Sequence, residues 1–170
     1  MAILGSNLIT TANALGAAPG SGEVLSLPMQ GGSPVTIATQ QPNAQFPMAC
    51  GPDICWWTGA PPNPMGPTGP GYIARLSSGN VTTISAFVYP WSLLFDGANF
   101  FETVGCDVCP GTLVRISPSG GTPVTMADAT FVAVDDQCAY FSVAVSSRLG
   151  DGIFSVDKSY VLPMPDASDQ

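Results

Sequence analysis

The chain of 170 residues carries only 4 basic residues against 12 acidic ones and no histidine, which gives a net charge of −8. So few positive charges cannot neutralise many phosphates, and the composition therefore argues against nucleic acid as a partner and against an anionic membrane surface. No apolar run approaches the length of a membrane-spanning helix, which argues against membrane insertion. The first residues lack the basic and apolar regions of a signal peptide, so we expect any export signal to have been removed or to precede this sequence.

Glycine and proline are frequent, at 19 and 17 residues, yet 45% of the chain is hydrophobic. The apolar residues fall in short alternating runs separated by turn residues, which is typical of strands and not of a disordered chain. The length is that of one domain. We therefore predict a single all-β domain over residues 1–170.

A two-strand pattern recurs along the chain. Its clearest copy is GTLVRISPSGGTPVTMA at 111–127, an earlier copy is GEVLSLPMQGGSPVTIA at 22–38, and weaker copies begin at Gly71 and Gly152. The last apolar residue of the first strand falls at positions 27, 76, 116 and 156, a spacing of 40 to 49 residues. Self-similarity at such a period indicates a repeat architecture.

A second hairpin precedes each copy of this pattern. It combines an apolar triplet, a turn with an aspartate and a pair of aromatic residues at Met48–Gly59, Leu93–Val104 and Val132–Val143, and a reduced form opens the chain. Each repeat therefore holds four strands, which we letter A to D in chain order. The aromatic residues, which we expect to pack between neighbouring sheets, are Trp56, Trp57, Phe100, Phe101, Tyr140 and Phe141.

Four-stranded repeats of this length are typical of β-propeller blades. We predict four blades of four antiparallel strands, at about 1–40, 44–85, 90–128 and 129–163, with a tail at 164–170. These blades form a closed four-bladed ring, half of an eight-bladed homodimer, or a fragment of a longer propeller chain. The weak first strand, Ala2–Leu4, favours the homodimer, because it makes closure of the chain on itself less stable.

The segments LVRISPSGGTPVTMA and FVAVDDQCAYFSV resemble the repeats of secreted bacterial β-propellers, which read G-x-V-x-R-x-x-x-G-G-x-P-x-x-L-A followed by A-V-D and V-Y-W-T. The likeness extends over nearly the whole chain, and Ser77–Asn80 departs from it by replacing the Gly-Gly-x-Pro turn. The resemblance implies the propeller architecture. It carries no catalytic motif, because such frameworks host many functions.

The B-to-C connections differ most between the repeats, and in a propeller they share one edge with the D-to-A connections. Variable loops on a repeated framework are where binding residues are usually placed. The longest connection, 59–70, contains five prolines, which favour an extended and preorganised conformation. The ligand-binding candidates are Trp57, Asn63, Met65, Tyr89, Glu102, Asp107 and Asp128.

These features favour a module that binds a protein, a small molecule or a glycan outside the cell or at its surface. An alternative is an enzyme of the lyase or hydrolase kind with its site at the channel mouth, and a third is a structural part of a larger assembly. The lack of histidine removes the usual general base and most zinc sites. We expect no cofactor. The one metal site that the acidic residues suggest is Ca²⁺ held by Glu102 with Asp107 or Asp128, where Glu102 occupies a position at which the repeat prefers Thr or Ser.

Other charged residues fit structural roles. Asp53, Asp96 and Asp135 fall in A-to-B turns, where an aspartate accepts hydrogen bonds from nearby backbone N–H groups. Arg75 and Arg115 occupy equivalent positions in strand C, so we expect them to make structural pairs and not to bind ligand.

The cysteines predict two local disulfides and an exported protein. Cys50 and Cys55 flank a tight turn, which brings cross-strand residues close to disulfide geometry. For Cys106 and Cys109 a disulfide is favoured over a metal site or a redox-active pair, because no partner cysteines or histidines stand at zinc spacing. Cys138 is expected to be free and buried.

Peptide mapping without reduction should therefore recover a Cys50–Cys55 link and a Cys106–Cys109 link, each within a single peptide. The physical reason is that both pairs are close in sequence, so their bonds form locally. A bond between Cys138 and any of the other four cysteines would contradict this pairing.

Overall fold

The computed structural model describes residues 1–12, 22–59, 71–87, 90–104, 111–129, 131–143 and 152–160. Within these ranges the chain forms fifteen strands and no helix, arranged as four separate antiparallel sheets. The prediction of an all-β chain is confirmed. Sheets of three or four strands that pair only with their chain neighbours are the local structure that the recurring hairpins indicate.

Each sheet corresponds to one sequence repeat, and we number the sheets 1 to 4. Sheet 1 holds β1 (Ala2–Leu4), β2 (Asn7–Ala12), β3 (Glu23–Pro28) and β4 (Val35–Ala38). Sheet 2 holds β5 (Gln45–Cys50), β6 (Asp53–Gly59), β7 (Gly71–Ser77) and β8 (Asn80–Phe87). Sheet 3 holds β9 (Pro90–Phe95), β10 (Phe100–Val104), β11 (Thr112–Ile116) and β12 (Val124–Asp128). Sheet 4 holds β13 (Phe131–Val134), β14 (Cys138–Val143) and β15 (Gly152–Asp157), and the expected fourth strand of this repeat would fall after residue 160, outside the described residues.

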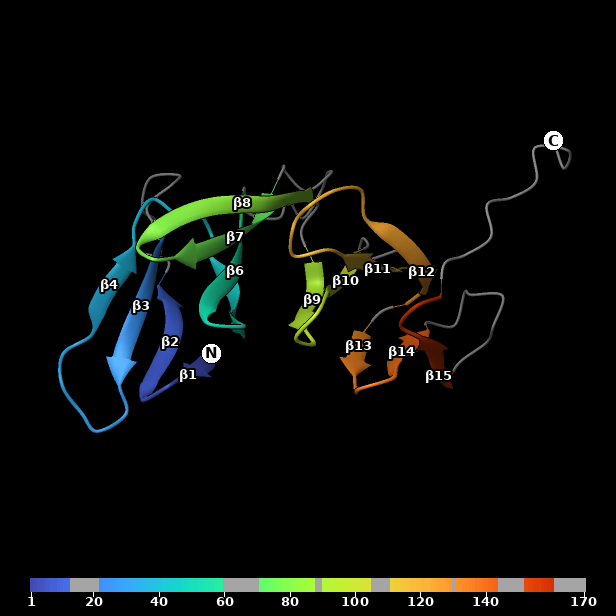
Figure 1. Cartoon of the computed structure of the whole chain (residues 1–170), viewed down its shortest axis with the longest axis horizontal. Coiled ribbons are helices and arrows are strands. Elements are labelled where there is room, and N and C mark those ends of the chain that lie inside the picture. Colours follow the sequence, from blue (N-terminus) through green and yellow to red (C-terminus); the bar gives the residue numbers. More distant parts are fainter. Residues whose placement is uncertain are drawn as a thin grey trace, which may run out of the picture.

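The sheets follow one another in space in the order of the chain. The first strands of the sheets are neighbours, because β1 contacts β5, β5 contacts β9, and β9 contacts β13. Figure 1 shows sheet 1 and sheet 4 at opposite ends of this row, with sheets 2 and 3 between them. We call the face of a sheet that looks toward the next sheet its forward face, and the opposite one its backward face.

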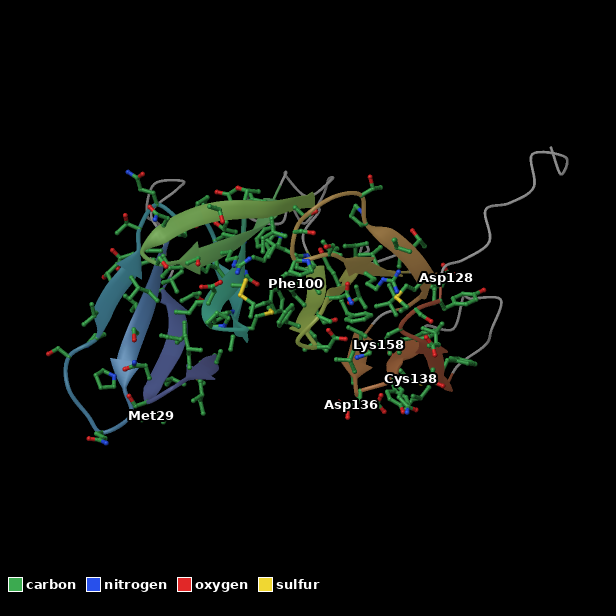
Figure 2. The ribbon with its side chains drawn as sticks, viewed as in Figure 1. Met29, Phe100, Asp128, Asp136, Cys138 and Lys158 are labelled. Atoms are coloured by element: carbon green, nitrogen blue, oxygen red, sulfur yellow. A yellow bond between two sulfur atoms is a disulfide. The ribbon has the colours of Figure 1, made fainter. Side chains whose placement is uncertain are left out.

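Successive side chains of a strand point to opposite faces of its sheet, so one strand contributes apolar residues to both faces. On β6, Trp56 belongs to an apolar cluster with Ile9 and Val24 of sheet 1, whereas Trp57 belongs to a cluster with Leu93 and Phe100 of sheet 3. All seven residues of β6 are buried, as expected for a strand covered on both faces. Figure 2 shows Phe100 in the middle of the molecule, where sheets 2 and 3 meet.

The expected packing of aromatic residues between sheets holds wherever two sheets meet. Five of the six aromatic residues named from the sequence are at most 5% exposed, and Tyr140 is 39% exposed. The prediction for Tyr140 is therefore wrong. Its side chain lies on the forward face of sheet 4, which no described sheet covers.

The cysteine predictions are confirmed in part. A disulfide joins Cys50 and Cys55 across the β5–β6 hairpin, with their Cα atoms 5.9 Å apart. Cys138 is free but half-buried, so the expectation of full burial is wrong for the same reason as for Tyr140. Cys106 and Cys109 lie outside the described residues, and their link stays a prediction.

Replacing Gly71 by alanine should destabilise the fold by roughly 1–3 kcal/mol, because a Cβ there would lie 2.2 Å from Cζ2 of the buried Trp57 ring. Urea unfolding measures this loss. Trp57→Phe removes the indole atoms that the Cβ would meet, so alanine at position 71 should cost less in that background. An equal cost in both backgrounds would contradict this close packing.

Candidate functional site

The A-to-B turns carry structural aspartates, as the sequence predicts. Asp96 accepts hydrogen bonds from the backbone N–H groups of Ala98 at 2.8 Å and Asn99 at 2.7 Å. Asp135 makes the equivalent pair of bonds within its own turn. Asp53 instead pairs with Arg75, whose Nε donates to the carboxylate at 2.7 Å and lowers the pKa of Asp53.

Lys158 ties sheet 3 to sheet 4 at this turn edge. Its ammonium donates to the Asp96 carboxylate at 2.5 Å and to the backbone carbonyl of Asp135 at 2.8 Å, and its own carbonyl accepts from Arg115. Burial acts to raise the pKa of Asp96, but the bonds from Lys158 and the turn backbone lower it below its usual value. The expected structural roles of Arg75 and Arg115 are thus confirmed. Figure 2 labels Lys158 beside sheet 4.

The D-to-A connection between sheets 1 and 2 holds a polar network that the sequence analysis missed. The buried Gln41 accepts a hydrogen bond from Nε1 of Trp56 at 3.1 Å and donates to the carbonyl of Thr39 at 2.9 Å. The next residue, Pro42, accepts from the Thr58 hydroxyl at 2.8 Å. The one signal in the sequence is the run of amides and proline at 39–45, TQQPNAQ, so close to a buried tryptophan.

The structure describes three of the seven ligand-binding candidates. Trp57 is fully buried between sheets 2 and 3, Glu102 is fully buried in the same layer, and Asp128 is exposed at the end of β12. Figure 2 labels Asp128 at that end of sheet 3. The other four candidates, Asn63, Met65, Tyr89 and Asp107, lie outside the described residues.

Glu102 is the most unusual side chain of this layer. It stands between Leu93 and Val114 in the cross-strand register of sheet 3, so all three side chains share the backward face that packs on sheet 2. Glu102 is 0% exposed, and neither carboxyl oxygen has a hydrogen-bond partner among the described residues. Burial without a compensating partner disfavours the charged form and raises the pKa of Glu102 to about 9.

The register also identifies what the repeat places at this position. Glu102 pairs with Val114 as Trp56 pairs with Ala74 and Phe141 with Phe154. The neighbouring sheets therefore fill the position of Glu102 with a large aromatic ring. The expectation that the repeat prefers Thr or Ser here is wrong for sheets 2 and 4, because aligning the aromatic pairs places Glu102 with Thr58 and Ser142, whereas the register places it with Trp56 and Phe141.

An open hollow of about 440 Å³ lies where the first strands of sheets 1, 2 and 3 meet. Its lining comes from β1, β5, β9 and the residue before β1, and it is apolar: Met1, Ala2, Ile3, Phe46, Pro47, Met48, Ala49, Leu93, Leu94 and Phe95. Phe46 sits in a bulge of β5 with a φ of 51°, a conformation that costs energy for a bulky residue. Strain of this kind clusters at binding sites. No pattern in the sequence indicates this hollow.

The described part of the chain contains no group of three or more metal-binding side chains. Asp107, one member of the suggested Ca²⁺ set, lies outside that part, so the Ca²⁺ site stays a prediction. No described helix could span a membrane.

No protein-family model matches the chain, and no curated protein matches it.

Glu102 should make stability fall as pH rises. The carboxyl keeps its proton in the folded chain up to a pKa of about 9, whereas the unfolded chain releases it near 4.5. Unfolding between these values releases a proton, so each pH unit costs up to about 1.4 kcal/mol of unfolding free energy. Urea unfolding from pH 5 to pH 8 measures this slope.

Glu102→Gln should flatten the slope over the same range, because the amide does not titrate. The same change at the half-exposed Glu23 serves as the matched control and should leave the slope as it is in the unmodified protein. A Glu102→Gln protein with an unchanged slope would contradict a neutral, buried Glu102.

Proposed function

We propose that the chain supplies four consecutive blades of a β-propeller and acts as a binding module outside the cell. The observation that carries the proposal is the contact of β1, β5, β9 and β13, the first strand of each sheet, in the order of the chain. Sheets that radiate from their first strands and pack face to face are the arrangement of propeller blades. The recurring sequence patterns support the same architecture.

The disulfide supports a place outside the cytosol. A disulfide such as Cys50–Cys55 persists in oxidising compartments and is rare in proteins of reducing compartments. The chain is also poor in charged residues, at 9%. With so few charged residues, the chain can form few ion pairs with a partner, so we expect apolar and neutral polar contacts to hold the partner.

The hollow favours apolar side chains of a peptide or protein as the ligand. Its described lining offers Met, Phe and Leu side chains and no charged side chain. A sugar needs several side-chain hydrogen bonds, which this lining does not supply, whereas apolar side chains gain free energy from burial there.

An enzymatic role is the second candidate, and Glu102 is the observation that favours it. A carboxyl group that is neutral at pH 7 can act as a general acid. Its full burial in the apolar layer between sheets 2 and 3 leaves no described route to a substrate. We therefore favour binding.

Selection of a phage-displayed random peptide library on the immobilised protein tests the binding role. Enriched peptides should contain apolar residues. They should lose at least about tenfold in affinity for a Met48→Ala/Leu94→Ala variant, because both side chains line the hollow. Gln30→Ala serves as the control, since the exposed Gln30 lies in the turn between β3 and β4 and does not line the hollow. Failure to enrich any peptide, or equal binding to all three proteins, would contradict the proposal.

A further inference from the structure

Sheet 4 exposes an apolar side chain at a position that is buried in every other sheet. Val24, Ile73 and Leu113 are each 0% exposed, whereas Ile153 is 82% exposed. The four residues are equivalent by cross-strand register, since they pair with Thr11, Trp57, Thr103 and Ser142 at the same step of strand B. In sheets 1 to 3 the next sheet covers this position. Among the described residues, nothing covers it in sheet 4.

The forward face of sheet 4 carries further side chains that an inter-sheet layer would cover. Tyr140 pairs with Ala133 and is 39% exposed, and the half-buried Cys138 lies two residues before it on the same face. The opposite face of this sheet packs normally, because Phe141 and Ala139 are buried against sheet 3. The exposed face is thus the unused half of an inter-sheet contact.

Sheet 1 has the reciprocal feature on its backward face. Ile3, Leu8 and Leu27 form one cross-strand row on this face, and Ile3 is 62% exposed. The equivalent row of sheet 3, Phe95, Phe100 and Ile116, packs against sheet 2. A row of three aliphatic side chains therefore stands at the place where a preceding sheet would lie.

The two exposed faces are the two types of face that pack against each other in this molecule. Every inter-sheet layer of this molecule joins the forward face of one sheet to the backward face of the next. The described chain leaves one forward face, on sheet 4, and one backward face, on sheet 1, at opposite ends of the row (Figure 1). A second copy of the same chain presents the missing partner of both faces.

We propose that two copies associate head to tail, with sheet 4 of each copy packed on sheet 1 of the other. Both exposed faces of both copies are then covered, and a head-to-tail contact that closes on itself forms a ring and not a filament. The inference builds on the blade arrangement proposed above. Its centre is the contact of Ile153 of one copy with the row of Ile3, Leu8 and Leu27 of the other.

Light scattering coupled to size-exclusion chromatography tests the dimer with the full chain at about 10 μM. We expect the mass of two chains. Ile153→Asp and Ile3→Asp should each raise the dissociation constant at least about 30-fold, because a charge then stands at the centre of an apolar interface. Both side chains are largely exposed within one copy, so neither change should lower the unfolding midpoint of the single chain. Val35→Asp, at an exposed apolar residue on the opposite face of sheet 1, is the control and should remain dimeric.

Mixing the two variants distinguishes a dimer that joins sheet 4 to sheet 1 from a dimer that joins two copies of the same sheet. In the mixture, sheet 4 of the Ile3→Asp chain and sheet 1 of the Ile153→Asp chain are both unmodified, so they should form a mixed complex that native mass spectrometry detects. A contact of sheet 1 with sheet 1, or of sheet 4 with sheet 4, would leave one variant dimeric by itself and would overturn the inference. A single-chain mass for the unmodified protein would also overturn it. If that protein still binds the selected peptides, the binding proposal stands and the dimer alone is wrong.

Discussion

Packing of one sheet face against the next is the interaction on which the rest of this structure depends. A sheet of three or four short strands has two faces and cannot bury either by itself, so each repeat relies on its neighbours. Sheet 2 shows the effect most fully, because Trp56 and Trp57, adjacent on β6, are both fully buried in different inter-sheet layers. Burial of an apolar side chain of this size contributes about 1.5–3 kcal/mol or more, and each of the two layers contains one such ring.

The need of each sheet for a neighbour also explains the exposed side chains of sheet 4 and the buried carboxyl group between sheets 2 and 3. Tyr140 and Cys138 are more exposed than the sequence pattern predicts, and Ile153 is largely exposed, because sheet 4 has no described neighbour on its forward face. Glu102 shows the opposite effect, since sheet 2 covers its position whatever residue stands there. The layer between sheets 2 and 3 therefore holds a neutral acid where the adjacent layers hold Trp56 and Phe141.

Much of the local structure could be predicted from the sequence, because it depends on short-range patterns. The strand repeats, the turn aspartates and the Cys50–Cys55 link all arise within a few residues along the chain. The orientation of Glu102 could not be predicted in this way. Aligning the aromatic pairs of the repeats matches Glu102 with Thr58, although the cross-strand register matches it with Trp56. The hollow and the Gln41 network depend on how whole sheets meet, which no local pattern encodes.

The central claim is that consecutive sheets pack face to face in chain order, and the two neighbouring tryptophans of β6 report on it directly. In an NMR spectrum assigned with Trp56→Phe and Trp57→Phe variants, the Trp56 ring should show nuclear Overhauser contacts to the methyl groups of Ile9 and Val24 in sheet 1. The Trp57 ring should show them to Leu93 and Val114 in sheet 3. Contacts of both rings to methyl groups of the same sheet would contradict the account.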